Sequence, residues 1–137
     1  MIRDVLSVEN LTKIYKDDKN NYGDIKALDN ISFSVKQGEV FGLLGPNGAG
    51  KTTFLNTLAG TVVKSSGRVN VWGFDIDKNP RQVKASIGIV PQEVNLDAFF
   101  SPKQLLELQA GLYGVTKNDR ITEIILNMVA LDKQANS

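Results

Sequence analysis

The chain has 137 residues and contains neither cysteine nor histidine. Without cysteine there are no disulfides and no thiolate metal sites. Without histidine there are no imidazole ligands, and the most common general base is absent. Metal sites and proton-transfer sites of these kinds are therefore excluded, and the lack of cysteine fits a cytoplasmic protein.

Long apolar runs and a large charge excess are also absent. No segment approaches the ~20 apolar residues that span a bilayer, and residues 1–9 carry charges where a secretory signal needs an apolar stretch. Sixteen basic and fifteen acidic side chains leave a net charge of +1, so there is no basic field to hold a polyanion. Nucleic acid is not an expected partner, and any link to a membrane must go through another protein.

The composition, 42% hydrophobic and 23% charged, is that of one folded domain or part of one. Alternating apolar residues predict strands at 5–11 and 31–35, joined by a polar loop at 16–24. The near-continuous apolar run at 39–44 predicts a strand buried on both faces of a parallel sheet. Further strands are predicted at 67–73 and 87–90.

Helices are predicted between and after these strands. The first covers 51–59 and is stopped by Gly60, and Asn79 and Pro80 begin a short one. A third begins after Ser101, where Gln104 completes a capping box, and runs to about Tyr113. The last is predicted from apolar residues at the spacing of one buried helical face. These residues are Ile121, Ile124, Ile125, Met128 and Val129.

The segment 45–52 fits the phosphate-binding pattern G-x-x-x-x-G-K-S/T, between the strand at 39–44 and the helix at 51–59. Gly48 and Gly50 allow backbone angles closed to other residues, so successive N–H groups can converge on phosphate oxygens at a helix N-terminus. Lys51 supplies charge to the β and γ phosphates, and Thr52 is a candidate ligand of the bridging Mg²⁺. The candidate nucleotide-binding residues are Gly45, Pro46, Asn47, Gly48, Ala49, Gly50, Lys51, Thr52 and Thr53.

Two other interpretations of this segment fit the sequence less well. A chance match is expected in roughly one of two hundred such chains, and the strand and helix context lowers that further. A dinucleotide-binding loop needs G-x-G-x-x-G, and the order of the glycines here is different. We therefore interpret 45–52 as a phosphate loop.

The segment 43–53 resembles the Walker A segment of ABC ATPases. Residues 27–35 and 66–69 resemble the strands before and after it, and 88–93 resembles the Q-loop of that family. The resemblance implies an α/β fold, a P-loop NTPase of the ABC ATPase type with an N-terminal antiparallel β subdomain and the start of a helical subdomain.

Within that fold the resemblance divides the chain into parts. It implies a β subdomain at 1–36 and 67–73, the Walker A strand, loop and helix at 37–66, the helix, strand and Q-loop at 79–92, and the helical subdomain at 93–137.

The family's Walker B acid, signature segment and switch histidine are not found. Although 129–132 is an apolar run ending in an acid, its helical spacing predicts a helix end. The chain is therefore expected to be truncated, the N-terminal part of one domain, and an isolated piece of this kind is expected to have low stability or to self-associate.

The resemblance also assigns candidate roles outside the loop. Tyr15 stands where the family carries an aromatic that stacks on adenine, the alternative being a half-buried aromatic at a strand end; Tyr22 is a weaker candidate. Gln92 matches the Q-loop residue that reaches Mg²⁺ and the attacking water, the alternative being a simple turn residue. Lys51 and Gln92 are thus the candidate catalytic residues, and Thr52 and Gln92 the candidate metal ligands.

Three aromatic residues are ambiguous. Phe99 and Phe100 could line a groove for a membrane subunit, with the surface 93–100 as its contact region, or be ordinary partly covered side chains. Trp72 is expected in the core of its strand.

The resemblance implies ATP and Mg²⁺ as ligands, and ATP binding and hydrolysis that energise solute export. The partners it implies are a membrane-spanning transporter subunit and a second ATP-binding subunit, with the protein peripheral at the cytoplasmic face of the membrane. Residues 91–96 and 109–115 look most like exporters of drugs and polysaccharides. A soluble ABC ATPase of translation or DNA repair is the alternative, and a non-catalytic nucleotide-binding piece a third. The chain itself is expected to bind nucleotide without turnover.

Overall fold

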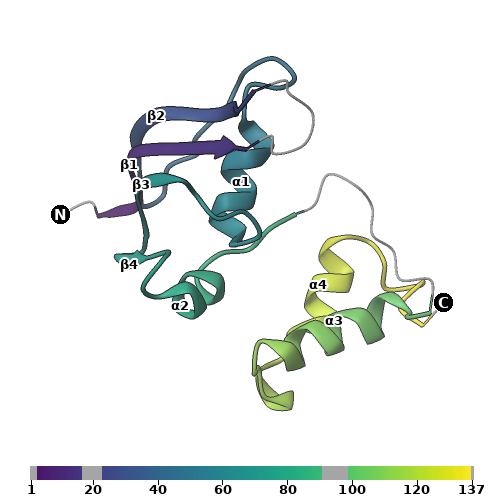
Figure 1. The fold of residues 1–137 in the computed structure, drawn as a ribbon. Coiled ribbons are helices and arrows are strands. Elements are labelled where there is room, and N and C mark those ends of the chain that lie inside the picture. Colours follow the sequence, from purple (N-terminus) through teal and green to yellow (C-terminus); the bar gives the residue numbers. More distant parts are fainter. Residues whose placement is uncertain (1–2, 17–22, 91–98, 137) are drawn as a thin grey trace. The chain divides into compact units, whose positions relative to one another are not determined.

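The computed structural model describes residues 3–16, 23–90 and 99–136. Its contacts divide the chain into two compact units, Met1–Ile89 and Val90–Ser137. The first unit is an antiparallel sheet with helix α1 (Lys51–Ala59) against it and a short helix, α2 (Pro80–Ala85), beside its last strand (Figure 1). The second unit is a pair of helices, α3 and α4.

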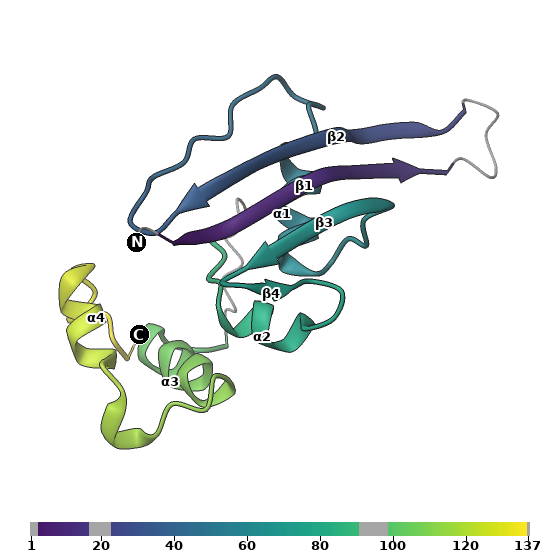
Figure 2. The same ribbon diagram turned by 90° about the vertical axis from the view of Figure 1, so that its left-hand side faces the viewer.

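Four strands form the sheet in the order β2-β1-β3-β4, and every pair is antiparallel (Figure 2). They are β1 (Asp4–Tyr15), β2 (Ile25–Lys36), β3 (Ser66–Val71) and β4 (Phe74–Asp75). The first two are longer than their sequence patterns predicted, because bulges interrupt the alternation while the strands continue. Asn10 and Asn30 stand at such irregularities with positive φ, a conformation that asparagine tolerates better than most residues.

One face of the sheet packs against helix α1 (Lys51–Ala59) and forms the core of the first unit. The buried cluster consists of Val8, Leu11, Leu28, Phe54 and Val69. The Phe54 ring lies 5.4 Å from the ring of Phe33 on β2, so α1 is held to the sheet by aromatic as well as aliphatic contacts. Each fully buried aliphatic side chain of this kind contributes roughly 1.5–3 kcal/mol to the free energy of unfolding.

The predicted strand at 39–44 is not present. The segment has no strand pairing, and Val40 and Leu44 are 99% and 95% exposed. A parallel strand exists only when hydrogen-bonded to its neighbours, and the sheet in the described part of the chain offers it none. The segment is held instead by Phe41, whose ring stacks on Phe33 at a centroid distance of 4.9 Å.

The strand predicted at 87–90 is absent for the same reason, and Val90 is 94% exposed. By contrast, α2 (Pro80–Ala85) begins at Pro80 as predicted. The strand predicted at 67–73 ends earlier, at Val71, because Trp72 and Gly73 both have positive φ and form the two-residue turn into β4. The expectation that Trp72 lies in the core was wrong: the turn takes its side chain out of the strand and leaves it 38% exposed.

The second unit contains α3 (Pro102–Leu112), a 3-10 turn η1 (Lys117–Asp119) and α4 (Thr122–Met128). The predicted capping box is confirmed, since the Ser101 hydroxyl accepts from the Gln104 amide and the Gln104 side chain accepts from the Ser101 amide. The two helices are joined by ionic contacts. Glu107 on α3 accepts from Arg120 at 2.5 Å and from the hydroxyl of Thr122, and Lys103 donates to Glu123 at 2.5 Å.

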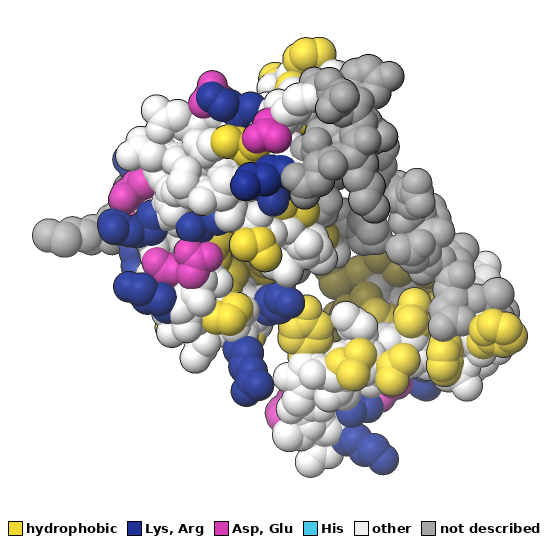
Figure 3. All heavy atoms as spheres, in the orientation of Figure 1, with side chains coloured by type: hydrophobic (Ala, Val, Ile, Leu, Met, Phe, Trp, Pro, Cys, Tyr) yellow, Lys and Arg dark blue, Asp and Glu magenta, His cyan; other side chains and the backbone are white. Residues whose placement is uncertain are grey.

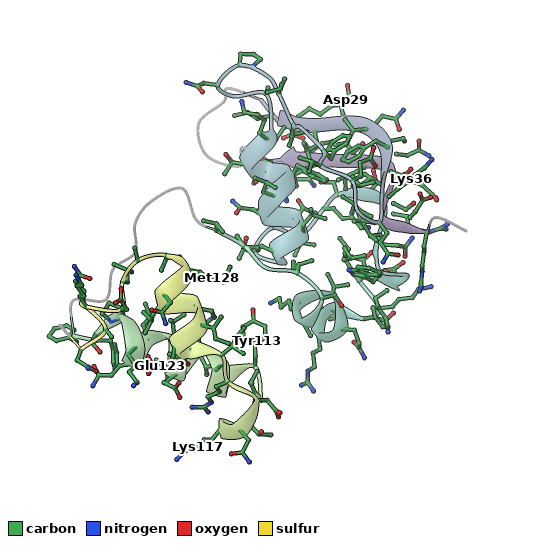
Figure 4. All side chains as sticks on the ribbon, turned by 180° about the vertical axis from the view of Figure 1, so that it is seen from behind. Asp29, Lys36, Tyr113, Lys117, Glu123 and Met128 are labelled. Atoms are coloured by element: carbon green, nitrogen blue, oxygen red, sulfur yellow. The ribbon has the colours of Figure 1, made fainter. Side chains whose placement is uncertain are left out.

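The buried face predicted for the last helix was wrong. Thr122 and Leu126 are the buried residues of α4, one turn apart. Ile121, Ile124, Val129 and Met128 are exposed, with Met128 81% accessible. The helix has only seven residues, and of the five predicted residues Ile125 alone is half-buried. Glu123 and Met128 lie near its two ends in Figure 4, and hydrophobic side chains gather on the face of this unit drawn in Figure 3.

Candidate functional site: the phosphate loop

The phosphate loop, residues 45–52, connects the segment after β2 to the first turn of α1. Gly48 and Gly50 have φ of 85° and 87°, the left-handed conformation predicted for them. A turn inside the loop is closed by the Ala49 amide, which donates to the Pro46 carbonyl at 3.2 Å. Residues 45–49 are all exposed, so the loop presents its backbone at the surface.

Lys51 is the first residue of α1, and its side chain folds back over the loop. Its Nζ donates to the carbonyl oxygens of Gly45 at 2.5 Å and Pro46 at 2.7 Å. The ammonium group is therefore held by the start of the loop, beside the turn at 46–49. This places a cation against the loop backbone, where it would stabilise an anion.

The first turn of α1 leaves backbone donors free within the helix. The first amide of α1 that makes a helical hydrogen bond is that of Phe54, which donates to the Gly50 carbonyl oxygen at 2.9 Å. The amides of Lys51, Thr52 and Thr53 precede it and have no acceptor inside the helix. With no acidic residue in the first turn, the positive end of the helix dipole is not offset. These features are those of an anion-binding helix N-terminus.

The side chains of Thr52 and Thr53 follow directly, and Thr52 is exposed. A hydroxyl fits Mg²⁺, which prefers oxygen ligands and usually keeps several waters beside one or two protein oxygens and the phosphates of its nucleotide. No group of three or more His, Cys, Asp or Glu side chains that could hold a metal occurs in the ranges the structure describes. The donor chemistry on this side of the loop therefore suits a phosphate-bridged magnesium rather than a metal caged by protein.

A close backbone contact sets the position of the loop on the sheet. A Cβ on Gly50 would collide with the carbonyl oxygen of Ala27 on β2 and lie 2.9 Å from Leu28 Cδ2. Only a glycine allows this approach, so the end of the loop rests directly on the first residues of β2.

Tyr15 ends β1 and pairs with Ile25, at the end of the hairpin that also carries Ala27. Its ring is 41% exposed, neither fully solvated nor part of the core. The structure thus brings Tyr15 and the phosphate loop to the same end of the β1–β2 hairpin.

The sequence reasoning missed a partner of Tyr15. The Nζ of Lys13 lies 4.7 Å from the centroid of the Tyr15 ring. The spacing of two residues along a strand could have indicated this contact, because residues i and i+2 share one face.

Several predicted residues lie outside the described part of the chain. Gln92, Tyr22 and residues 93–98 of the predicted contact surface are among them, so their placement stays a prediction. Phe99 is exposed and Phe100 is 43% exposed, and both belong to the second unit. In the described ranges, no helix is both long and apolar enough to cross a membrane.

The chain is similar to proteins of one known family. The family profile described as "ABC transporter" matches residues 28–137. An ABC transporter ATP-binding protein of Pyrococcus furiosus is 42% identical over 133 residues, covering 96% of this chain and 46% of that protein. The linearmycin resistance ATP-binding protein of Bacillus subtilis is 41% identical over 120 residues, covering 85% of this chain and 38% of that protein.

Similarity extends to a further resistance protein and to solved structures. The doxorubicin resistance ATP-binding protein of Mycobacterium tuberculosis is 43% identical over 96 residues, covering 70% of this chain and 29% of that protein. A solved ATP-binding subunit of an ABC transporter matches the fold with a TM-score of 0.81 at 23% identity, covering 97% of this chain and 53% of that one. A dimeric ATP-binding cassette with bound ADP and Pi matches with a TM-score of 0.75 at 25% identity, covering 96% of this chain and 60% of that one.

The chain spans about half the length, or less, of these curated relatives. The family match covers most of the chain, and the fold of the solved ATP-binding subunit is shared over nearly all of it. The predicted α/β fold of the ABC ATPase type is therefore confirmed over the part of it that this chain spans, and the chain belongs to the family of ABC transporter ATP-binding domains.

Proposed function

We propose that this chain binds Mg-ATP and Mg-ADP through the phosphate loop. The observation that carries the proposal is the combination of two left-handed glycines, a lysine folded over the loop and an α1 N-terminus with open amides. Phosphates would occupy the place where these donors converge, and Lys51 would exchange its carbonyl acceptors for β- and γ-phosphate oxygens.

The remaining roles extend this proposal. Thr52 would ligate Mg²⁺, with Gln92 as a second ligand that also reaches the attacking water, and Thr53 would contact the α phosphate. Tyr15 would supply the stacking surface for adenine, which its partial exposure at the loop end of the hairpin supports. Magnesium would supply charge neutralisation between the β and γ phosphates.

The full-length protein would couple ATP hydrolysis to solute export, with a membrane-spanning subunit and a second ATP-binding subunit at the cytoplasmic face of the membrane. Support comes from the names of similar proteins, which include linearmycin resistance, doxorubicin resistance and Nod factor export. The surface at 93–100 would contact the membrane subunit. Crosslinking of the full-length protein should map to this surface, whereas crosslinks confined to 16–24 would contradict the assignment.

The 137-residue chain is proposed to bind nucleotide without turning it over. Phosphoryl transfer depends on groups that orient water and close over the γ phosphate. The chain contains no histidine, and no Walker B acid or signature segment is recognisable in its sequence. The site would therefore stay open even in a dimer of this chain.

Calorimetric titration tests both parts of the proposal. Mg-ATP should bind in a Mg-dependent manner, and Lys51→Ala should weaken binding by at least tenfold, because Lys51 is the only cationic side chain in the sequence 45–52. Lys36→Ala, in β2, is the matched control and should leave the affinity unchanged. Phosphate release should be no faster than in buffer. Turnover that disappears in Lys51→Ala would show that the chain carries a complete catalytic site.

A further inference from the structure

The contact between Lys13 and Tyr15 is not explained by the roles given above. The Lys13 ammonium lies 4.7 Å from the Tyr15 ring centroid, inside the ~6 Å range in which a cation is attracted to an aromatic face. The two residues are i and i+2 of β1, so their side chains leave the strand on the same side. One face of the Tyr15 ring is therefore covered by a cation.

Lys13 is held from a second direction. Its Nζ donates to the carbonyl oxygen of Val63 at 2.8 Å, fifty residues later in the sequence. Val63 lies in the connection from α1 to β3, and Ser65 of the same connection is hydrogen-bonded to β1. The Ser65 amide donates to the Thr12 carbonyl at 2.9 Å, and the Ile14 amide donates to the Ser65 hydroxyl at 2.9 Å. The Lys13 ammonium is thus hydrogen-bonded to a segment that is itself hydrogen-bonded to β1.

The geometry has a consequence for any base that stacks on Tyr15. With Lys13 over one face, a planar ligand that stacks on the ring must take the opposite face. A ring anchored through a fixed cation also loses less rotamer freedom when a ligand binds than a free ring would. Tyr15 pairs with Ile25, two residues before Ala27, on whose carbonyl Gly50 rests, so the ring lies at the phosphate-loop end of the hairpin.

We propose that Lys13 is a positioning residue for the nucleotide base: it covers one face of the Tyr15 ring and holds the ring so that adenine stacks on the other. The inference rests on the proposed adenine contact of Tyr15 and extends it by one residue. Lys13 itself does not touch the nucleotide; it acts through Tyr15.

The alternative is that Lys13 has only a structural role and links β1 to the α1–β3 connection through its hydrogen bond to Val63. Comparing two ligands separates these roles, because Mg-ADP carries the base and magnesium tripolyphosphate does not. Loss of a positioning residue weakens the binding of Mg-ADP alone. A loss of structure, or of positive charge near the phosphates, weakens the binding of both ligands.

The experiment is calorimetric titration of the 137-residue chain and its variants with both ligands, with circular dichroism melting of each variant in parallel. Lys13→Met should weaken Mg-ADP binding by about 2- to 5-fold, the factor that corresponds to a solvent-exposed cation–π contact. It should leave tripolyphosphate binding unchanged. Lys13→Arg, which keeps a cation for the ring and a donor for Val63, should restore ADP binding to within twofold of the parent chain. In a Tyr15→Ala background, Lys13→Met should have no further effect.

If Lys13→Met weakens the binding of both ligands equally, the inference is overturned and Lys13 has only a structural role. Unchanged ADP binding in Lys13→Met, with weakened binding in Tyr15→Ala, would overturn the role of Lys13 and leave the adenine contact standing. Unchanged binding in Tyr15→Ala would overturn the adenine contact itself, and this inference with it. Loss of ADP binding in Lys13→Arg equal to that in Lys13→Met would also count against a positioning cation.

Discussion

Gly50, at the end of the phosphate loop, lies so close to Ala27 on β2 that a Cβ on the glycine would collide with the alanine carbonyl oxygen. Its φ of 87° is moreover a conformation that residues with a Cβ rarely adopt. One residue thus satisfies two independent requirements. It turns the chain into α1, and it lets the loop rest on the sheet.

Gly50→Ala should therefore lower the free energy of unfolding by about 1–3 kcal/mol, the usual cost of a strained backbone position, and weaken Mg-ADP binding as the loop is displaced. Urea denaturation and calorimetric titration measure the two effects. Gly42→Ala is the control, because a Cβ at Gly42 meets nothing within 4 Å and its φ is not in the left-handed range. Equal stability of the two variants would contradict the proposed contact.

Ala130 follows α4 with a φ of 57°, a left-handed conformation that costs a residue with a Cβ about 1–2 kcal/mol. Ala130→Gly removes this cost but adds freedom to the unfolded chain, worth about 0.4–1 kcal/mol. The second unit should therefore gain about 0.5–1 kcal/mol of stability, by the difference of the two effects. Far-UV circular dichroism during thermal unfolding measures it. The same substitution inside α3, Ala110→Gly, should instead destabilise by about 1 kcal/mol. If both variants lose stability, the conformation of Ala130 carries no cost.

The carboxylate of Glu107 should make the second unit sensitive to acid. The hydroxyl of Thr122, followed by the guanidinium of Arg120, holds the pKa of Glu107 below its ordinary value of 4.5. Because this pKa is lower in the folded state, the contribution is fully present above pH 4.5 and is lost as the pH falls through the folded-state pKa. The helical signal of the chain should therefore decrease in that acidic range.

Glu107→Gln should flatten this acid transition while reducing stability at neutral pH, since the amide carries no charge for Arg120. A pH titration followed by circular dichroism measures the change. Asp132→Asn, which removes a carboxylate elsewhere in the same unit, should keep the transition. An identical pH profile in the parent chain and in Glu107→Gln would show that other groups cause the acid response.

The segment 39–44 should promote self-association of the isolated chain, because Val40 and Leu44 are almost fully exposed beside backbone that pairs with no strand of the described sheet. Replacing both by lysine should lower the associated fraction in light scattering. Val63→Lys removes an equally apolar exposed residue from another segment and should have a smaller effect. A monomer that melts cooperatively in the parent chain would contradict this expectation.

Local sequence signals predicted the local features of the structure. The bounds of α1, the left-handed angles of Gly48, Gly50 and Gly60, and the capping box of Ser101 and Gln104 all follow from interactions within a few residues. The same kind of signal failed at 39–44 and 87–90. An apolar run indicates that a segment favours burial as a strand. It does not indicate whether a neighbouring strand is present to form the hydrogen bonds.

By itself the sequence therefore indicated the candidate phosphate loop, the helix that follows it and the family, because the required glycines, lysine and threonine are adjacent in the chain. Only the tertiary structure decided which apolar residues are covered, as Leu126 is and Met128 is not. It also decided that Gly50 rests on Ala27 and that Lys13 reaches both Tyr15 and Val63. The approach of Gly50 to Ala27 and of Lys13 to Val63 depends on segments far apart in the sequence that meet only when β1, β2 and α1 pack together, so no local pattern specifies it.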